Sequence, residues 1–362
     1  MNKKIVVIVV AALVCVAGVF VYTNRANVVG KLVEAKISQY LESSEYVDEY
    51  SVDGVTYKDG QLNIPELSMM IKGNSVKLAA QATGVNPEAK TAEKLVISGI
   101  SIDNESLFSC SIESISFDGL DFMQTETLLE TASLVNNPFA FQRADVANMA
   151  CKTPDNVALT MESASAEGPF PAGDEIPAKS SMVISNILID MMGTSVRIPE
   201  IRGGELYDAS TDIVSAAYEP VLVEGLFVLE MEAKMADYSK FIKQYAQDPL
   251  NTSISFSYMR FKLDDKGFSD TMFATLGAMT GVDAASAQQT MEMQIAGNTT
   301  DFVDNYDNGL AIQQALVNYV RQPDSIEFVL APDEPVVFST ETAEDIMLYL
   351  ADYGMSISVN GG

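Results

Sequence analysis

The chain has no histidine and no tryptophan among its 362 residues. The lack of histidine excludes Ser-His-Asp and Cys-His catalysis, histidine general bases and histidine-based zinc sites. No glycine-rich phosphate loop lies between a strand pattern and a helix pattern, and the Gly-x-Ser-x-Gly and Ser-x-x-Lys signatures of hydrolases are missing. The sequence therefore predicts a protein that is not an enzyme, with no catalytic residue and no cofactor.

Basic residues are scarce: 22 lysines and arginines stand against 50 aspartates and glutamates, which gives a formal net charge of −28. A field of this sign repels nucleic acid and anionic lipid headgroups, and it favours cations or basic partners. We therefore expect no nucleic-acid partner. The alternative to a cation or basic partner is that the acidic surface only keeps the protein soluble. The acidic stretch Asp301–Gly309 does not fit the calcium register of an EF-hand, so no metal site is predicted.

Cysteine is also rare, with three residues in the chain. Cys15 lies in a long apolar run, which leaves Cys110 and Cys151 as the candidate disulfide. A bridge would close a loop of about 40 residues and stabilise the fold by about 4 kcal/mol by the chain-entropy estimate. Two free, buried thiols are the alternative, and the spacing in the sequence does not separate the two.

The one long hydrophobic run is Ile5–Tyr22, and Lys3 and Lys4 precede it. A helix of that length is about 27 Å long, close to the hydrocarbon thickness of a bilayer, and the positive-inside rule keeps its lysine end in the cytoplasm. We therefore predict a transmembrane signal-anchor at residues 1–25, contact with the inner membrane through residues 5–22, and a single-pass protein whose bulk lies in the periplasm. Cleavage, which would release a periplasmic protein, is the alternative.

Beyond residue 25 the hydrophobic periodicity changes twice. The spacing in Asn27–Leu41 is typical of an amphipathic helix, so residues 26–50 are predicted to form a membrane-proximal helix and linker. Short strand-like runs punctuated by Gly, Asn and Asp then predict a β-rich extracytoplasmic body at residues 51–250, and an α+β portion follows at residues 251–362. The predicted fold class is α+β, with an N-terminal transmembrane helix, an antiparallel β-rich body with duplicated strand units, and a helical C-terminal portion.

An internal repeat lies within the predicted body: Leu95–Asp103 matches Met182–Asp190 at most positions, 87 residues further along the chain. We interpret it as a duplicated β unit, with chance similarity between β-rich segments as the alternative. Strict alternation along the first copy would place Val96, Ile100 and Ile102 on one face of a sheet. The other face would be the more polar one.

Several single elements are predicted with bounds. A helix is expected at Gln142–Met149, and Gly168–Gly173 is interpreted as a loop between two units. The C-terminal portion is predicted to contain, in chain order, helices at Asp270–Met279, Ala284–Ile295 and Leu310–Val320 and a strand at Ser325–Leu330. Asp270 and Asp283 are the expected N-caps of the first two helices.

The order of parts at the front of the chain resembles that of the AsmA-like and YdgA-like bacterial envelope proteins. A lysine-led apolar run is followed by the helix Asn27–Leu41 and then by the β segment Val52–Ile71, which opens long antiparallel runs. Those proteins are tethered to the inner membrane and project a β-rich body into the periplasm. The resemblance implies a membrane-anchored periplasmic protein that serves as a scaffold or handles lipids or other envelope components, with lipid or envelope proteins as partners.

Two other functions are compatible with the composition. An acidic extracytoplasmic binding or adhesion module would use the negative surface to hold basic partners. A carboxylate-based hydrolase would need two carboxyl groups about 5 to 10 Å apart in a cleft, and spacing among so many acidic residues does not single out a pair. The sequence does not fix the oligomeric state.

Overall fold

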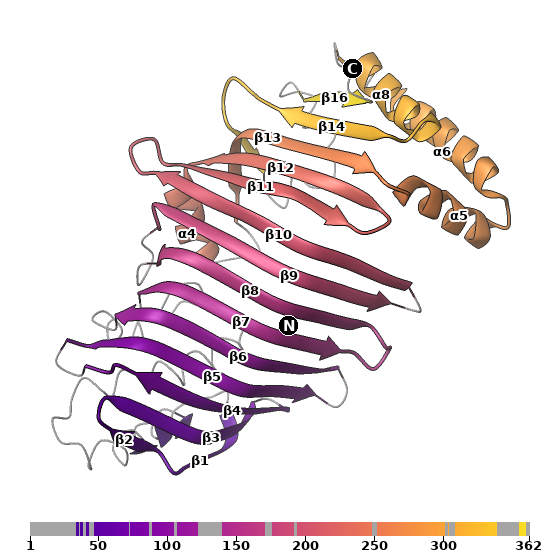
Figure 1. Ribbon diagram of the computed structural model, residues 1–362. Coiled ribbons are helices and arrows are strands. Elements are labelled where there is room, and N and C mark those ends of the chain that lie inside the picture. The colour runs from indigo at the N-terminus through magenta and orange to yellow at the C-terminus, as the bar shows by residue number, and fades with distance from the viewer. Residues whose placement is uncertain are drawn as a thin grey trace. The chain divides into compact units, whose positions relative to one another are not determined.

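The computed structural model describes two compact units, Met1–Val196 and Arg197–Gly362 (Figure 1). The described residues are, in chain order, 34–35, 37–38, 41–42, 47–71, 73–86, 89–104, 107–121, 140–170, 176–191, 194–247, 252–300, 303, 308–338 and 355–359. No peptide bond described is cis.

The first unit is an antiparallel meander. Its strands are β1 (Val47–Asp53), β2 (Thr56–Lys58), β3 (Gln61–Ile71), β4 (Asn74–Thr83), β5 (Thr91–Asn104), β6 (Phe108–Asp121), β7 (Phe141–Lys152), β8 (Ala158–Phe170) and β9 (Lys179–Met191). From β3 to β9 each strand pairs with the next one in the sequence, while β1 and the short β2 both pair with β3. The register shifts in the β3–β4 pairing between Ile64 and Leu67, next to Pro65, which has no amide hydrogen to donate to a neighbouring strand.

The second unit combines further antiparallel strands with four described helices. Its elements are β10 (Thr194–Asp208), which begins just before the boundary, β11 (Ile213–Val223), β12 (Phe227–Ala236), α4 (Tyr238–Gln247), β13 (Ile254–Asp265), α5 (Phe268–Thr280), α6 (Ala284–Asn298), α8 (Gly309–Arg321), β14 (Ser325–Leu330), β15 (Val336–Phe338) and β16 (Ser356–Val359). The strands run in the order β10-β11-β12-β13-β14-β16, and β15 pairs with β13. Ile312 of α8 packs with Leu330 and Val336 in the core of this unit.

The predicted α+β class is wrong, because most described residues lie in antiparallel strands. The prediction assumed that strands come first and helices afterwards. In the structure α5, α6 and α8 are inserted between β13 and β14, two strands that pair directly with each other. The chain therefore returns to the sheet after its helices, and the C-terminal portion is a sheet with helical insertions.

The predicted transmembrane helix at Ile5–Tyr22 lies outside the described residues. None of the helices that the structure describes is long and apolar enough to span a bilayer. Of the predicted helix Asn27–Leu41, the side chains of Ile37 and Leu41 are described, and both are buried in the core of the first unit. They pack there with residues of β3 to β6, such as Ile64 and Ile97.

The smaller elements of the second unit agree well with the sequence. α5, α6, α8 and β14 confirm the predicted helices and strand to within a few residues. Asp283 caps α6, since its carboxylate accepts a hydrogen bond from the Ser286 amide. Asp270 is not a cap, because α5 begins at Phe268, and the carboxylate of Asp265 accepts from the Ser269 amide instead.

Two predictions for the first unit fail. Gln142–Met149 is part of strand β7 rather than a helix. Its Ala and Met residues favour a helix, but pairing on both sides with β6 and β8 overrides this weak preference. Of the predicted loop Gly168–Gly173, residues 168–170 belong to strand β8. The remaining residues, 171–173, lie outside the described residues.

Candidate functional site: the apolar face of the first unit

Strand β5 does not show the strict alternation between faces that its sequence predicts. Leu95 and Ile97 are buried, and so are Ile100 and Ile102, which means that the buried positions change from odd to even numbers. The change occurs at Gly99, whose φ of 59° places it in the left-handed region that glycine adopts without strain. The predicted face containing Val96 is therefore wrong: Val96 is only partly buried, and Leu95 and Ile97 take its place.

The same backbone device recurs on every second strand. Asn148 of β7 and Asn186 of β9 have φ values of 47° and 51°, and asparagine is the residue after glycine that best tolerates this conformation. On the strands between them, the facing residues are Glu113 of β6 and Glu162 of β8. The Asn148 side-chain amide donates a hydrogen bond to the Glu113 carboxylate, and the Asn186 side-chain amide donates one to the Glu162 carboxylate. Each left-handed asparagine is thus linked by its side chain to the neighbouring strand.

These positions leave the register intact, so apolar residues from five strands line up in four rungs across β5 to β9. Residues directly opposite each other in neighbouring strands share a face of the sheet. The rungs are Leu95-Phe117-Ala144-Ala166-Met182, Ile97-Ile115-Val146-Ala164-Ile184, Ile100-Ile112-Met149-Met161-Ile187 and Ile102-Cys110-Cys151-Leu159-Ile189. We call these twenty residues the apolar face. None of the twenty side chains carries a charge or an amide.

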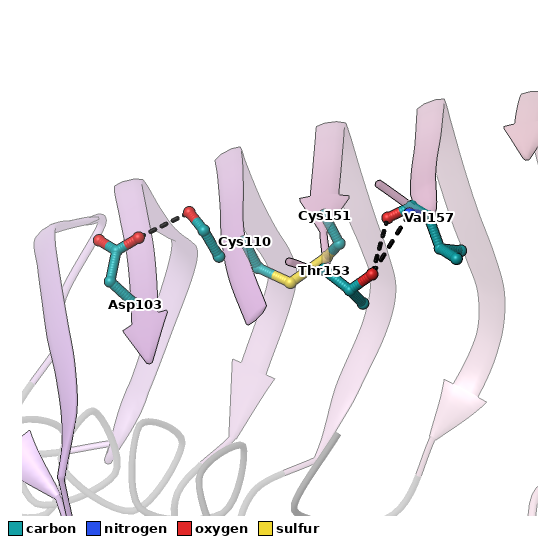
Figure 2. The surroundings of a disulfide bond; sticks show 6 residues. Asp103, Cys110, Cys151, Thr153 and Val157 are labelled. Atoms are coloured by element: carbon teal, nitrogen blue, oxygen red, sulfur yellow. Dashed lines mark hydrogen bonds between the residues drawn. A yellow bond between two sulfur atoms is a disulfide. The ribbon is translucent and has the colours of Figure 1, made fainter. Parts of the chain in front are cut away.

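The candidate disulfide residues meet in the fourth rung. Cys110 of β6 and Cys151 of β7 lie directly opposite each other, and the structure joins them in a disulfide (Figure 2). Of the two alternatives that the sequence left open, the structure thus has the bridge. Because β6 ends at Asp121 and β7 begins at Phe141, no short turn sets the register of this pair, and the disulfide links the two strands covalently.

The apolar face is buried over β5 and only partly buried over β7 to β9. On β5 its residues are at most 5% exposed. On β7, β8 and β9 all twelve are partly exposed, and none of the described residues between 140 and 213 is buried. We call these twelve residues the open strip; they are Ala144, Val146, Met149, Cys151, Leu159, Met161, Ala164, Ala166, Met182, Ile184, Ile187 and Ile189.

The two faces of this part of the sheet differ in chemistry. A rung on the opposite face consists of Ser98, Ser114, Ala147, Ser163 and Ser185. Small and hydroxyl-bearing side chains there suit water, whereas Ile, Leu and Met on the open strip do not. One end of the apolar face carries an aromatic cluster, in which Phe141 stacks on Phe170 at 4.6 Å between ring centroids and meets Phe117 edge-on at 5.4 Å.

The most concentrated charges of the second unit neutralise one another. Arg260 of β13 contacts Glu327 at 2.6 Å, Glu230 at 3.1 Å and Glu232 at 3.2 Å. The hydrogen bond to Glu327 and the nearby carboxylates raise the pKa of the Arg260 guanidinium. Lys262 pairs in turn with Asp264 and Glu230. Because both cations already have carboxylate partners, this network cannot serve as an anion site without being broken.

The described residues offer little for metal or hydrolytic chemistry. No group of three or more acidic or cysteine side chains among them is placed to hold a metal ion. Among the described residues that line a cavity of about 540 Å³ at the ends of β5, β6 and β7, one carries a carboxyl group, Asp103. Glycoside hydrolysis needs two carboxyl groups, so this cavity does not favour the hydrolase alternative.

Sequence reasoning missed the open strip, although its signal is present in the chain. In β5 to β8 a Glu or Gln precedes a Gly or Asn by six residues, as in Glu93–Gly99, Glu113–Gly119, Gln142–Asn148 and Glu162–Gly168. Apolar residues stand between and beyond these positions at spacings of two and three. The repeat between Leu95–Asp103 and Met182–Asp190 is one instance of this pattern. The pattern recurs from strand to strand and does not mark two duplicated units.

Comparison with known proteins adds one match. A family model described as "Uncharacterized protein" matches residues 221–352, which run from the last part of β11 to beyond β15. No curated protein and no solved structure matches the chain. The matched segment lies in the second unit, and the open strip lies outside it.

Proposed function

We propose that this protein is a non-enzymatic, membrane-anchored periplasmic protein of the bacterial envelope, and that its open strip holds lipid acyl chains. The observation that carries the proposal is the partial exposure of twelve apolar residues on three adjacent strands. Contiguous apolar patches of this kind mark interaction sites on soluble surfaces. The resemblance to AsmA-like and YdgA-like proteins belongs to the same proposal, and the apolar segment Ile5–Tyr22 would hold the protein at the inner membrane.

The dimensions of the open strip suit an acyl chain. From Leu159 to Ala166 the strip extends over seven residue steps, or about 23 Å at about 3.3 Å per residue. Its three strands span about 10 Å between the outer two. One leaflet of a bilayer has a hydrocarbon depth of about 15 Å, half of the ~30 Å core, so a lipid tail can lie along the strip at full length.

The chemistry of the open strip favours hydrocarbon over a basic protein partner. Its side chains carry no charge, and their only hydrogen-bonding atoms are the weakly accepting sulfurs of Cys151 and of three methionines. A protein partner chosen by the acidic composition would instead bind the charged surface. Transfer of apolar area from water contributes about 25 cal/mol per Å², and it requires no directional contact, which suits chains of varied length.

The test is lipid analysis of the full chain purified from detergent-solubilised membranes. Ala164 and Ser163 are neighbours in β8, both partly exposed, and they face opposite sides of the sheet. We expect wild type and Ser163→Lys to carry lipid. Ala164→Lys should lose most of it, because a bound tail would remove the new lysine charge from water without giving it a partner. Wild-type protein without lipid above the detergent background, or equal loss in both variants, would overturn the proposal.

A further inference from the structure

Two methionines face each other in the open strip. Met149 of β7 and Met161 of β8 are directly opposite in the third rung, and both are partly exposed. Residues paired in this way have Cβ atoms about 5 Å apart, so the two thioether side chains are neighbours. Because β8 is the middle one of the three strands of the strip, a lipid tail that lies along the strip passes over Met161.

The sulfur atoms of this pair are accessible to reagents in solution, unlike those of the buried methionines. Met69, for example, is 3% exposed in the core of the first unit. Met279 is 78% exposed, but it belongs to helix α5 of the second unit. Met182, the third methionine of the strip, lies in the first rung at one end of it. Met149 and Met161 thus combine access to their sulfur atoms with a position under a bound tail.

The neighbours of the pair on the apolar face have no side-chain hydrogen-bond donor. In the third rung the pair lies between Ile112 and Ile187. In the adjacent rungs the same two strands carry Val146, Ala164, Cys151 and Leu159, and Cys151 is in the disulfide. An oxygen atom added to either sulfur is therefore hydrogen-bonded by water as long as the strip is empty, and these side chains do not replace that water when a tail is bound.

We propose that Met149 and Met161 form an oxidation site, at which a hydroperoxide converts a thioether to a sulfoxide and the strip then releases its lipid. The inference rests on the proposed function. A sulfur lone pair attacks the outer oxygen of the R–O–O–H group, and the O–O bond breaks. The outer oxygen stays on sulfur, and its proton passes to the departing oxygen to give R–OH. Sulfur loses two electrons and the peroxide gains them, and thiol-dependent sulfoxide reductases reverse the change.

Oxidation weakens lipid binding because a sulfoxide is polar where the thioether was apolar. A bound tail removes the new S=O group from water without giving it a donor, and we expect about tenfold weaker binding. The hydroperoxide has two sources, namely hydrogen peroxide in the surrounding water and an oxidised unsaturated tail held in the strip. A tail in the strip lies against the sulfur atoms, so its hydroperoxide should react at lower concentration.

The experiment uses the full chain in detergent micelles, in a Met182→Leu background that leaves the pair as the only methionines of the strip. The protein is treated with hydrogen peroxide or with a phospholipid hydroperoxide. Peptide mass spectrometry then locates the added oxygen, and native mass spectrometry measures binding of a phosphatidylcholine with saturated tails. We expect oxygen at Met149 and Met161 and about tenfold weaker binding, which a methionine sulfoxide reductase restores.

Two double variants distinguish the pair from other exposed methionines. Met149→Leu with Met161→Leu keeps the rung apolar at nearly the same volume, and it should bind lipid equally well before and after treatment. Met279→Leu with Met293→Leu is the matched control, because it removes two thioethers that are more exposed but lie outside the strip. This control should lose lipid binding on treatment as the parent protein does.

The outcomes separate this inference from the proposed function. Unchanged binding after both methionines have gained oxygen, or an equal loss of binding in the leucine variant of the pair, would overturn the inference and leave the acyl-chain proposal standing. Absence of oxygen at the pair when Met279 is oxidised would overturn it as well. Untreated protein that binds no lipid would overturn the proposed function, and the release of lipid with it. Reaction with the lipid hydroperoxide at concentrations where hydrogen peroxide has no effect would support the bound tail as the source, and equal reaction would support the hydroperoxide in water.

Discussion

Removal of the disulfide should weaken the first unit by an amount that follows from its loop. Cys110 and Cys151 are separated by 41 residues, for which the chain-entropy estimate gives about 4 kcal/mol of stabilisation. The test variant is Cys110→Val with Cys151→Val, because valine keeps the fourth rung apolar and removes only the covalent link. In urea, with a slope of about 2 kcal/mol per M, the unfolding midpoint should fall by about 2 M.

A second variant tests whether the disulfide stabilises the fold by fixing the register between β6 and β7. The apolar pattern repeats every five residues, so a slip of that length would still match apolar residues, for example Ile112 with Ala144 in place of Met149. Moving the bridge one rung, by Ile112→Cys and Met149→Cys in the valine background, should restore nearly all of the lost stability because the loop is almost as long. The midpoint is measured under oxidising conditions and again with dithiothreitol, and Cys15→Ser serves as the control for the third thiol.

Two results would refute this reasoning. An unchanged midpoint in the valine variant would show that closing the loop does not stabilise the fold. Failure of the moved bridge to form, in a protein that is otherwise folded, would show that Ile112 and Met149 are not opposite each other, and the rungs would then be wrong.

Three further predictions concern single residues. Gly99→Val should lower the free energy of unfolding by about 1–2 kcal/mol. No atom lies near the position of the new Cβ, so the cost is that of a β-branched residue in the left-handed backbone conformation. Gly99→Asn should cost less, and equal losses for the two variants in urea unfolding would argue against this explanation. Asp283→Ala should cost about 1 kcal/mol by removing the cap of α6, while Asp283→Ser should be nearly neutral by thermal unfolding; a loss as large for serine would rule out capping as the cause. Burial acts to raise the pKa of Asp265, but hydrogen bonds from Ser269, Gly267 and Tyr319 outweigh it, so the pKa is lowered. The ionised carboxylate therefore stabilises the fold above about pH 4, and this contribution is lost as the pH falls further; Asp265→Asn should have a shallower acid dependence, and an unchanged slope would contradict the assignment.

The elements of the second unit could be predicted because local signals there agree with the tertiary structure. Ala284–Ile295 has a cap, helical composition and a following turn, and it forms α6. The fold class could not be predicted in the same way. Nothing local in Ser325–Leu330 indicates that it pairs with β13 across α5, α6 and α8, because pairing at long sequence separation is a property of the folded chain.

The apolar face was missed for a different reason. A period of two is the usual guide to strand faces, and it fails wherever a left-handed residue changes the phase. At Gly99 the error moved Val96 to the wrong face, and it hid the spacing of two and three that marks all four rungs. Cys110 and Cys151 were the one pair of site residues that the sequence could nominate, since the count of cysteines leaves no other pairing outside the apolar run.

Because each strand from β5 to β8 carries the whole pattern by itself, the number of strands in this part of the sheet can change without a change of the pattern. A hairpin inserted between β7 and β8 would meet the same residues on both sides that those strands now present to each other. Strands would be added two at a time, because a single extra antiparallel strand would leave the chain at the opposite end of the strands from where β8 begins. Relatives of this protein should therefore differ in the width of the apolar face by whole hairpins, that is, by an even number of strands.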